Sequence, residues 1–162
     1  IVFHLRRKVE EELRKLECEG IIEKVEGQTL WVSPIVVTQK PKQAGEVCIC
    51  IDMHLRNTAI RRECHLTLML DDIIYDLSGA SLFSKMDLRA RYHQLRLHQD
   101  SCYITTFSTH VGLRRYKWLN FGLSSVAEVF QNTILKVLVG IPGVLNVSDD
   151  ILVYAKSAKE HH

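Results

Sequence analysis

The sequence contains no uninterrupted apolar run of about 18 residues, so no segment is long enough to cross a bilayer as a helix. Its first residues, Ile-Val-Phe-His-Leu-Arg-Arg-Lys, lack the apolar core and cleavage site of a secretory signal peptide. The five cysteines are an odd number, which does not suit a disulfide framework. We therefore expect free thiols in a reducing compartment, namely the cytoplasm with the nucleus as the alternative, and no membrane partner.

The motifs of several enzyme classes are also missing. The sequence has neither a Gly-rich P-loop nor a Gly-x-Ser-x-Gly elbow, so nothing supports an NTPase or a serine hydrolase. A zinc site built from Cys48, Cys50, Cys64 and His65 is an alternative, but this spacing is not a recognised ligand pattern. Cys48 and Cys50 are more simply explained as neighbours on one face of a strand. With 162 residues, 46% of them hydrophobic, and no repeat or linker, the chain is expected to form one domain, with two lobes as a variant.

The net charge is only +2, but basic residues are concentrated in the middle of the chain. The basic residues from 85 to 117 are Lys85, Arg89, Arg91, Arg96, Arg114, Arg115 and Lys117, and the only acids there are Asp87 and Asp100. Such a block can face a polyanion, although charge alone favours a solvated basic surface.

The apolar periodicity predicts a mixture of helices and strands. Leu5, Val9, Leu13 and Leu16 recur at helical spacing and Gly20 follows them, which is typical of an amphipathic helix with a glycine cap. Strands are predicted at 31–38, 46–52, 80–88, 93–97, 103–106 and 113–118, and 21–25 is expected to be a short strand or an extended exit from the first helix. A short helix is predicted at 71–79, and a second helix from a capping box at 125–128 to residue 140. Residues 53–70 are expected to be irregular and 120–123 to form a loop. This interleaving predicts an α+β fold.

The stretch from Val144 to Tyr154 predicts a hairpin, because two apolar arms flank three polar residues. Its tip places Asp149 beside Asp150, an arrangement that suits a divalent cation, while a solvated turn explains it equally well. Asp87 ends another predicted strand. If these strands are neighbours, the three carboxylates can hold two Mg²⁺ ions about 3.5–4 Å apart. Carboxylates with basic groups nearby are the parts that phosphoryl transfer requires.

Several segments resemble the successive motifs of reverse transcriptases, above all those of gypsy-type LTR retrotransposons. These segments are Trp-Val-Ser-Pro-Ile-Val-Val from Trp31, Ile-Cys-Ile-Asp from Ile49, Phe-Ser-Lys-Met-Asp-Leu-Arg-Ala-Arg-Tyr-His-Gln from Phe83, Asn-Phe-Gly-Leu-Ser-Ser-Val-Ala-Glu-Val-Phe-Gln from Asn120, and Val-Ser-Asp-Asp from Val147. The resemblance covers nearly the whole chain in the right order. It implies a right-hand polymerase with an antiparallel palm sheet backed by helices. Residues 1–77 would be fingers-like and 78–162 palm-like, and the sequence would end before the thumb and the ribonuclease H domain of the parent polyprotein.

The resemblance implies an RNA-directed DNA polymerase whose partners are an RNA template, a DNA primer and a dNTP. Asp87, Asp149 and Asp150 would be the catalytic, metal-binding carboxylates for two Mg²⁺ ions, with Mn²⁺ as a substitute. Tyr92 would stack under the incoming sugar, although a buried core tyrosine is the default without the motif. The other substrate-binding residues would be Phe121, Gly122 and Gln131 around template and nucleotide, Lys40 and Lys42 on a fingertip hairpin, and Leu88 beside the first carboxylate.

Departures from the family pattern affect two of its contacts. Cys48 stands where an arginine usually contacts the triphosphate, and Arg91 stands where a small residue usually lets the backbone approach phosphate. These and similar changes are each reachable by one transition, so the hypothesis is a decaying element copy with impaired activity. Two alternatives remain open: a non-catalytic module that binds RNA or an RNA–DNA hybrid, and an inactive retroelement remnant.

Overall fold

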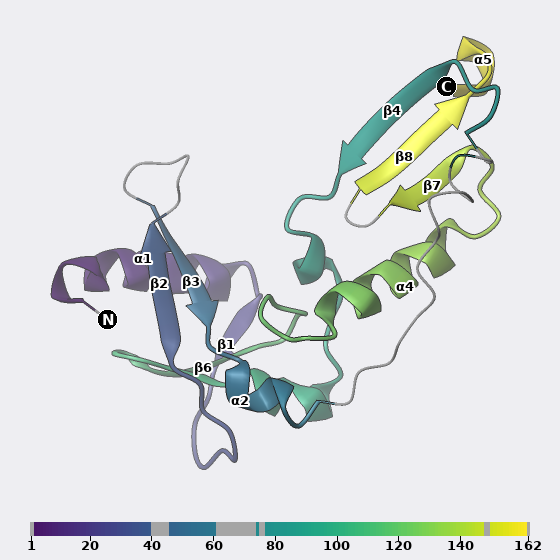
Figure 1. Cartoon of the computed structure of the whole chain (residues 1–162). Helices are drawn as coiled ribbons and strands as arrows, with labels where there is room; N and C mark the ends of the chain where they lie inside the picture. The colour runs from purple at the N-terminus through teal and green to yellow at the C-terminus, as the bar shows by residue number, and fades with distance from the viewer. Residues whose placement is uncertain (1, 40–45, 61–73, 75–76, 148–149, 162) are drawn as a thin grey trace. The chain divides into compact units, whose positions relative to one another are not determined.

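The computed structural model describes residues 2–39, 46–60, 74, 77–147 and 150–161 (Figure 1). The chain divides into two compact units. The first unit comprises Ile1–Arg61 and Tyr92–Val126, and the second comprises Arg62–Arg91 and Ala127–His162. Within the described residues, no helix has the length and apolar character needed for a bilayer crossing.

The first unit begins with a short 3₁₀ turn, Phe3–Leu5, which continues directly into helix α1, Arg6–Cys18. Val9, Leu13 and Leu16 are buried on one face of α1, because residues three and four apart lie one above the other on a helix. Gly20 adopts a positive φ of 69° just beyond the helix end. The predicted amphipathic helix and its glycine cap are confirmed.

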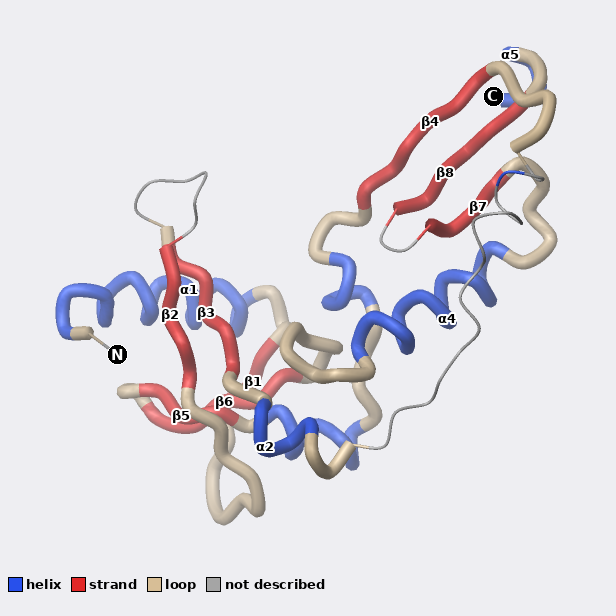
Figure 2. Tube along the Cα trace, in the orientation of Figure 1, coloured by secondary structure: helices blue, strands red, loops and turns tan. Residues whose placement is uncertain are grey.

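Two small antiparallel sheets complete the first unit (Figure 2). Strands β1 (Ile22–Lys24), β6 (Gly112–Tyr116) and β5 (Phe107–Thr109) pair in that order. Strands β2 (Ile35–Gln39) and β3 (Val47–Ile51) form a separate pair. The connection 40–45, with Lys40 and Lys42, lies outside the described residues.

The core of the first unit joins helix α1 to both sheets. Its buried members are Val9, Leu13, Leu16, Ile22, Val47, Ile51, Met53, Phe107 and Tyr116. Each large apolar side chain removed from water in this way contributes about 1.5–3 kcal/mol. The one-turn helix α2, His54–Asn57, follows β3 within the segment predicted to be irregular. Residues 61–73 lie outside the described residues, and with them most of the helix predicted at 71–79.

Two of the predicted strands are wrong. The structure has 3₁₀ turns at Arg91–Gln94 and Gln99–Thr105 instead of strands at 93–97 and 103–106. Threonine hydroxyls explain the second turn, since Thr105 Oγ1 donates to Cys102 O at 2.7 Å and Thr106 Oγ1 donates to Tyr103 O at 2.8 Å. These local bonds compete with the long-range hydrogen bonds of a strand. The strand predicted from residue 31 begins only at Ile35.

The second unit contains a three-stranded antiparallel sheet in the order β4 (Leu82–Asp87), β8 (Asp150–Ala155), β7 (Val144–Val147) (Figure 2). The predicted β7–β8 hairpin is confirmed, while residues 148–149 of its tip lie outside the described residues. Helix α4, Val126–Leu138, precedes β7 and begins where the capping sequence predicts, and helix α5, Ala158–His161, packs on β8. Helices and antiparallel sheets together confirm the α+β class.

Candidate active site

Asp87 and Asp150 occupy directly opposite positions on neighbouring strands. Asp87 is the last residue of β4, Asp150 is the first residue of β8, and the register pairs them. Opposite residues of an antiparallel pair point to the same face, with Cβ atoms about 4.5–5.5 Å apart. Strand pairing therefore places both carboxylates at one end of one face of the sheet. Asp149 lies outside the described residues.

Lys85 adds a positive charge to this end of the sheet. It lies two residues before Asp87 on β4, so both side chains point to the same face. Its Nζ atom lies 2.7 Å from Oδ2 of Asp150, in a pair whose side chains are 66% and 32% exposed. The hydrogen bond to Asp150, the charge of Asp150 and then the charge of Asp87 raise the pKa of the Lys85 ammonium group. The lysine therefore experiences the field of both carboxylates.

The two carboxylates fit a magnesium ion in ligand type and number. Mg²⁺ prefers oxygen ligands and is commonly held by one or two carboxylates, completed by water and substrate phosphates. Among the described residues, no group of three or more His, Cys, Asp or Glu side chains is close enough to hold a metal ion. Asp149, the third carboxylate predicted from the sequence, lies outside them.

Tyr92 belongs to the first unit and is buried there. It is 4% exposed, and its ring centroid lies 4.6 Å from that of Phe121 in an edge-on arrangement. Phe121 is 57% exposed, so the tyrosine is covered while the phenylalanine reaches solvent. This burial matches the core-tyrosine alternative, and the role under the incoming sugar stays a prediction.

The loop at Gly122 is fixed by a residue that sequence reasoning missed. Asn57 Nδ2 donates to Gly122 O at 2.8 Å, and the Ser124 amide donates to Asn57 Oδ1 at 2.8 Å. Gly122 has φ +98°, and a Cβ there would lie 3.2 Å from Ile51 O and 3.3 Å from Met53 Cγ. The loop therefore requires glycine. A single Asn in a polar one-turn helix gives no sequence signal for this role.

The remaining predicted site residues within the described chain, Leu88 and Gln131, both belong to the second unit. Leu88 follows Asp87 and is half-buried, and Gln131 is half-buried on α4. Ala90 adopts a left-handed φ of 48°, a conformation that costs a non-glycine residue about 1–2 kcal/mol. This strained position lies one residue before Arg91, where the resemblance expects a small side chain.

A buried arginine organises the polar interior of the first unit, and it too was missed. Arg56 is 4% exposed; its Nε atom donates to Ile104 O at 2.7 Å and Nη2 donates to Thr106 O at 3.2 Å. Its Nη1 atom donates to Ser33 Oγ, and that hydroxyl donates to Asp52 O. Burial lowers the pKa of Arg56, against the charge of Asp52, which raises it. Sequence alone places arginine on the surface, because only tertiary contacts supply such acceptors.

The basic block is only partly solvent-facing. Arg114 is buried and its Nε atom donates to Glu17 Oε1, so a solvated position for this residue is wrong. Arg115 Nε donates to Glu23 Oε1 at 2.6 Å across the β1–β6 pair. Two of the seven basic residues are therefore neutralised by acids from the N-terminal part of the chain.

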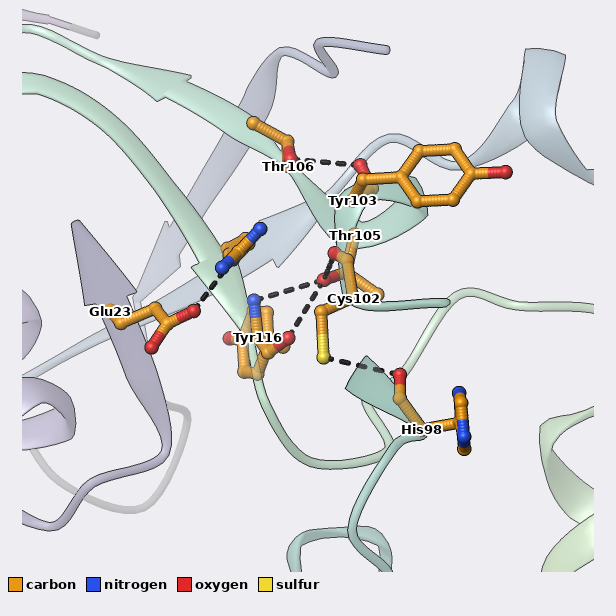
Figure 3. A network of polar contacts seen from close by, with 8 residues as sticks. Glu23, His98, Cys102, Tyr103, Thr105, Thr106 and Tyr116 are labelled. Atoms are coloured by element: carbon orange, nitrogen blue, oxygen red, sulfur yellow. Dashed lines mark hydrogen bonds and ion pairs between the residues drawn. The ribbon is translucent and has the colours of Figure 1, made fainter. Parts of the chain in front are cut away.

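A cavity of about 440 Å³ lies beside Arg96, Arg115 and Lys117 of this block. Its lining contains the basic residues Arg96, His98, Arg115 and Lys117, together with Glu23 and Cys102. Figure 3 shows the bonds that hold its wall: Thr105 Oγ1 donates to Cys102 O and accepts from the Tyr116 amide at 2.9 Å, and Cys102 Sγ donates to His98 O. The positive charges of Arg96 and Lys117 suit an anionic ligand.

The sequence is similar to parts of retroelement and viral polyproteins. An uncharacterized protein of Caenorhabditis elegans is 33% identical over 155 residues, which cover 94% of this chain and 12% of that protein. The enzymatic polyprotein of Soybean chlorotic mottle virus is 29% identical over 156 residues, which cover 91% of this chain and 22% of the polyprotein. The Tf2-3 transposon polyprotein of Schizosaccharomyces pombe is 25% identical over 123 residues, covering 75% of this chain and 9% of the polyprotein. The chain thus spans less than a quarter of these relatives, and no family model matches it.

Solved structures give the fold. Foamy viral protease-reverse transcriptase in complex with double-stranded DNA matches 99% of this chain and 27% of that chain, with a TM-score of 0.79 and 19% identity. The native prototype foamy virus protease-reverse transcriptase matches 99% of this chain and 21% of its own chain, with a TM-score of 0.81 and 18% identity. This chain has the fold of a segment of a reverse transcriptase. The sequence relatives and the fold together support a retroelement polymerase-type domain.

Proposed function

We propose that this chain is part of the RNA-directed DNA polymerase of a gypsy-type retroelement polyprotein and takes part in nucleotidyl transfer onto a primer 3′-hydroxyl. The observation that supports this most is the direct pairing of Asp87 with Asp150 on β4 and β8. The similarity to retroelement polyproteins and the reverse transcriptase fold support it further. In this proposal, residues 1–77 act as fingers and 78–162 as palm, and the thumb and ribonuclease H regions belong to other parts of the parent polyprotein.

The carboxylates supply the chemistry of the site. Asp87, Asp149 and Asp150 would hold two Mg²⁺ ions, which would supply activation of the attacking hydroxyl and stabilisation of the leaving oxygen. The chain fixes the separation of Asp87 and Asp150 by backbone pairing, which is more rigid than placement on a loop. Lys85 keeps a positive charge beside them.

The partners in this proposal are an RNA template, a DNA primer and a dNTP. Foamy viral protease-reverse transcriptase has been solved with double-stranded DNA and with an RNA/DNA hybrid, which supports nucleic acid as the partner class. The residues proposed to contact substrate are Lys40, Lys42, Leu88, Tyr92, Phe121, Gly122 and Gln131. The free thiols in the described chain agree with a cytoplasmic location, which is part of the proposal.

Primer extension tests the proposal. The chain, alone and joined to the thumb region of a relative, is given an RNA template, a labelled DNA primer, dNTPs and Mg²⁺. Asp87→Asn and Asp150→Asn should each lower extension by at least roughly 100-fold, because ion binding in the transition state is worth several kcal/mol. Asp100→Asn, an exposed aspartate of the other unit, is the matched control and should keep the activity. Equal extension by all variants would disprove the assignment.

The same assay tests the proposed impairment. Cys48 cannot provide the charge of an arginine, and Arg91 adds bulk where the family has a small residue. A double variant, Cys48→Arg with Arg91→Gly, should therefore bind dNTP more tightly and extend faster than the unmodified chain. No gain from the double variant would remove these two residues as the cause of weak activity.

A second candidate function is nucleic-acid binding without chemistry, which the cavity lined by Arg96 and Lys117 favours. Filter binding over a salt series separates the two. Salt-sensitive binding of an RNA–DNA hybrid without extension, unaffected by Asp150→Asn, indicates the binding module. Absence of both binding and extension indicates an inactive remnant.

A further inference from the structure

Strand β3 presents two thiols side by side. Side chains alternate along a strand, so Cys48 and Cys50 share one face while Val47 and Ile51 are buried on the other. The two Sγ atoms lie 3.9 Å apart, and both cysteines are exposed and free of disulfides. The sequence expectation that they occupy one face of a strand is confirmed.

The sulfur separation favours a bridging atom over a disulfide. A disulfide requires an S–S distance of about 2.05 Å, and residues two apart in a strand have Cα atoms about 6.6–6.8 Å apart, the upper limit for bridged cysteines. By contrast, one atom could bind both sulfurs. At the usual metal–thiolate length of about 2.3 Å, the sulfur–atom–sulfur angle would be roughly 115°. The two sulfurs are therefore close enough for one atom to bind both.

The site offers two thiolate ligands, and this number limits the kind of atom that can bind between them. Structural zinc takes four protein ligands, but no third His, Cys, Asp or Glu among the described residues joins the two sulfurs in a metal-binding group. Two thiolates suit a soft, thiophilic centre that needs few ligands. We propose that Cys48 and Cys50 form a dithiol site for such a centre, with trivalent organic arsenicals as the ligand class.

A cavity of about 350 Å³ beside the thiols offers room for the organic part of the ligand. Both cysteines line it, together with the apolar residues Leu16, Ile49, Ile51, Tyr116 and Phe121. Residues from both faces of β3 contribute, because β3 is an edge strand of its two-stranded sheet. An aryl group held by an atom bridging the sulfurs can lie against these side chains.

The two thiols act on each other electrostatically. Burial, and next the neighbouring Cys48, raise the pKa of the Cys50 thiol, because two adjacent thiolates repel each other. A positively polarised centre between the sulfurs removes this repulsion. In the reaction with an arsine oxide, two S–H bonds break and two As–S bonds form. The oxide oxygen leaves as water with both protons, and arsenic stays trivalent, so no oxidant is needed.

The test uses phenylarsine oxide and the full chain carrying Cys64→Ser, because Cys64 lies outside the described residues. Intact mass should show one arsenical per chain with the loss of two titratable thiols. Cys48→Ser and Cys50→Ser should each weaken binding by roughly 100-fold, the usual gain from linking two binding groups. Cys18→Ser, which removes an exposed thiol on α1, is the matched control and should bind like the Cys64→Ser background.

A second measurement needs no change at the site. Phenylarsine oxide should protect Cys48 and Cys50 together from N-ethylmaleimide, as mapped by peptide mass, while Cys18 still reacts. The proposal is overturned if the arsenical binds one thiol at a time, if Cys18→Ser abolishes binding, or if the two serine variants bind as the background does. Circular dichroism of each variant shows whether the fold is kept. If a variant is unfolded, the protection experiment on the chain with both cysteines tests the proposal instead.

Discussion

The ammonium group of Lys85 lies 2.7 Å from the carboxylate of Asp150, and the strand partner of Asp150 is Asp87. The positive charge of Lys85 therefore lies at the end of the sheet where backbone pairing places Asp87 and Asp150 side by side. Its presence reduces the repulsion between them. It also makes Lys85 a competitor for any metal ion that Asp150 binds.

Replacing Lys85 by methionine should tighten Mn²⁺ binding, because Asp150 is then no longer shared with an ammonium group. The gain should be only several-fold and should shrink in high salt, since exposed ion pairs contribute little. Titration calorimetry measures it, and Lys136→Met, an exposed lysine on α4, is the control. Weaker binding in Lys85→Met would instead make the lysine a contributor to the site.

Replacing Arg56 by methionine should destabilise the first unit by about 3 kcal/mol, because Ser33, Ile104 and Thr106 lose their buried donor. Both tryptophans of the chain, Trp31 and Trp118, belong to this unit, so their fluorescence in urea reports its unfolding.

The control for this change is Arg7→Met. Arg7 is exposed on α1 and pairs with Glu11, four residues on, so its loss should alter stability by less than about 0.5 kcal/mol. Equal effects of the two substitutions would show that the Arg56 contacts do not stabilise the fold.

Replacing Gly143 by alanine should loosen the second unit by about 2–4 kcal/mol. Gly143 has φ +72°, and a Cβ there would lie 2.6 Å from Tyr154 O, so strain and a backbone clash add. Gly140 also has a positive φ but has open space around it, so Gly140→Ala should cost only about 1–2 kcal/mol. Hydrogen exchange of the Tyr154 amide, which donates to Gly143 O at 2.8 Å, measures the difference.

Tyr116 should make the first unit sensitive to alkali. Burial, and then the charges of Cys48, Cys50 and Glu12, raise its pKa far above the usual value of about 10. The pKa of Tyr116 is higher in the folded state than in the unfolded state. Its contribution to the free energy of unfolding is therefore complete below pH 10 and declines above it by about 1.4 kcal/mol per pH unit. Tyr116→Phe should abolish this part of the decline in urea titrations between pH 9 and pH 11. Tyr103→Phe, at an exposed tyrosine, serves as the control; an unchanged slope in Tyr116→Phe contradicts the prediction.

The two strand predictions failed where the backbone did not pair with a neighbouring strand over the predicted length. At 103–106 the residue types favour a strand, but the hydroxyls of Thr105 and Thr106 find nearby carbonyl groups and close a 3₁₀ turn. At 93–97 only a short β-like contact forms, with an isolated bridge between Arg96 and Trp118. Propensity describes the local chain, whereas the partners of each backbone group are chosen by tertiary packing.

Sequence periodicity by itself determined helix α1, its glycine cap, the β2–β3 and β7–β8 hairpins and the α+β class, because these depend on contacts between residues close in the chain. The polar hairpin tip, the end of a predicted strand and the resemblance to reverse transcriptases singled out Asp87, Asp149 and Asp150. Only the tertiary structure decided that Asp87 and Asp150 face each other, that Arg56 is buried, and that Asn57 fixes the loop at Gly122. These facts depend on strand register and on acceptors dozens of residues away, and no local pattern encodes them.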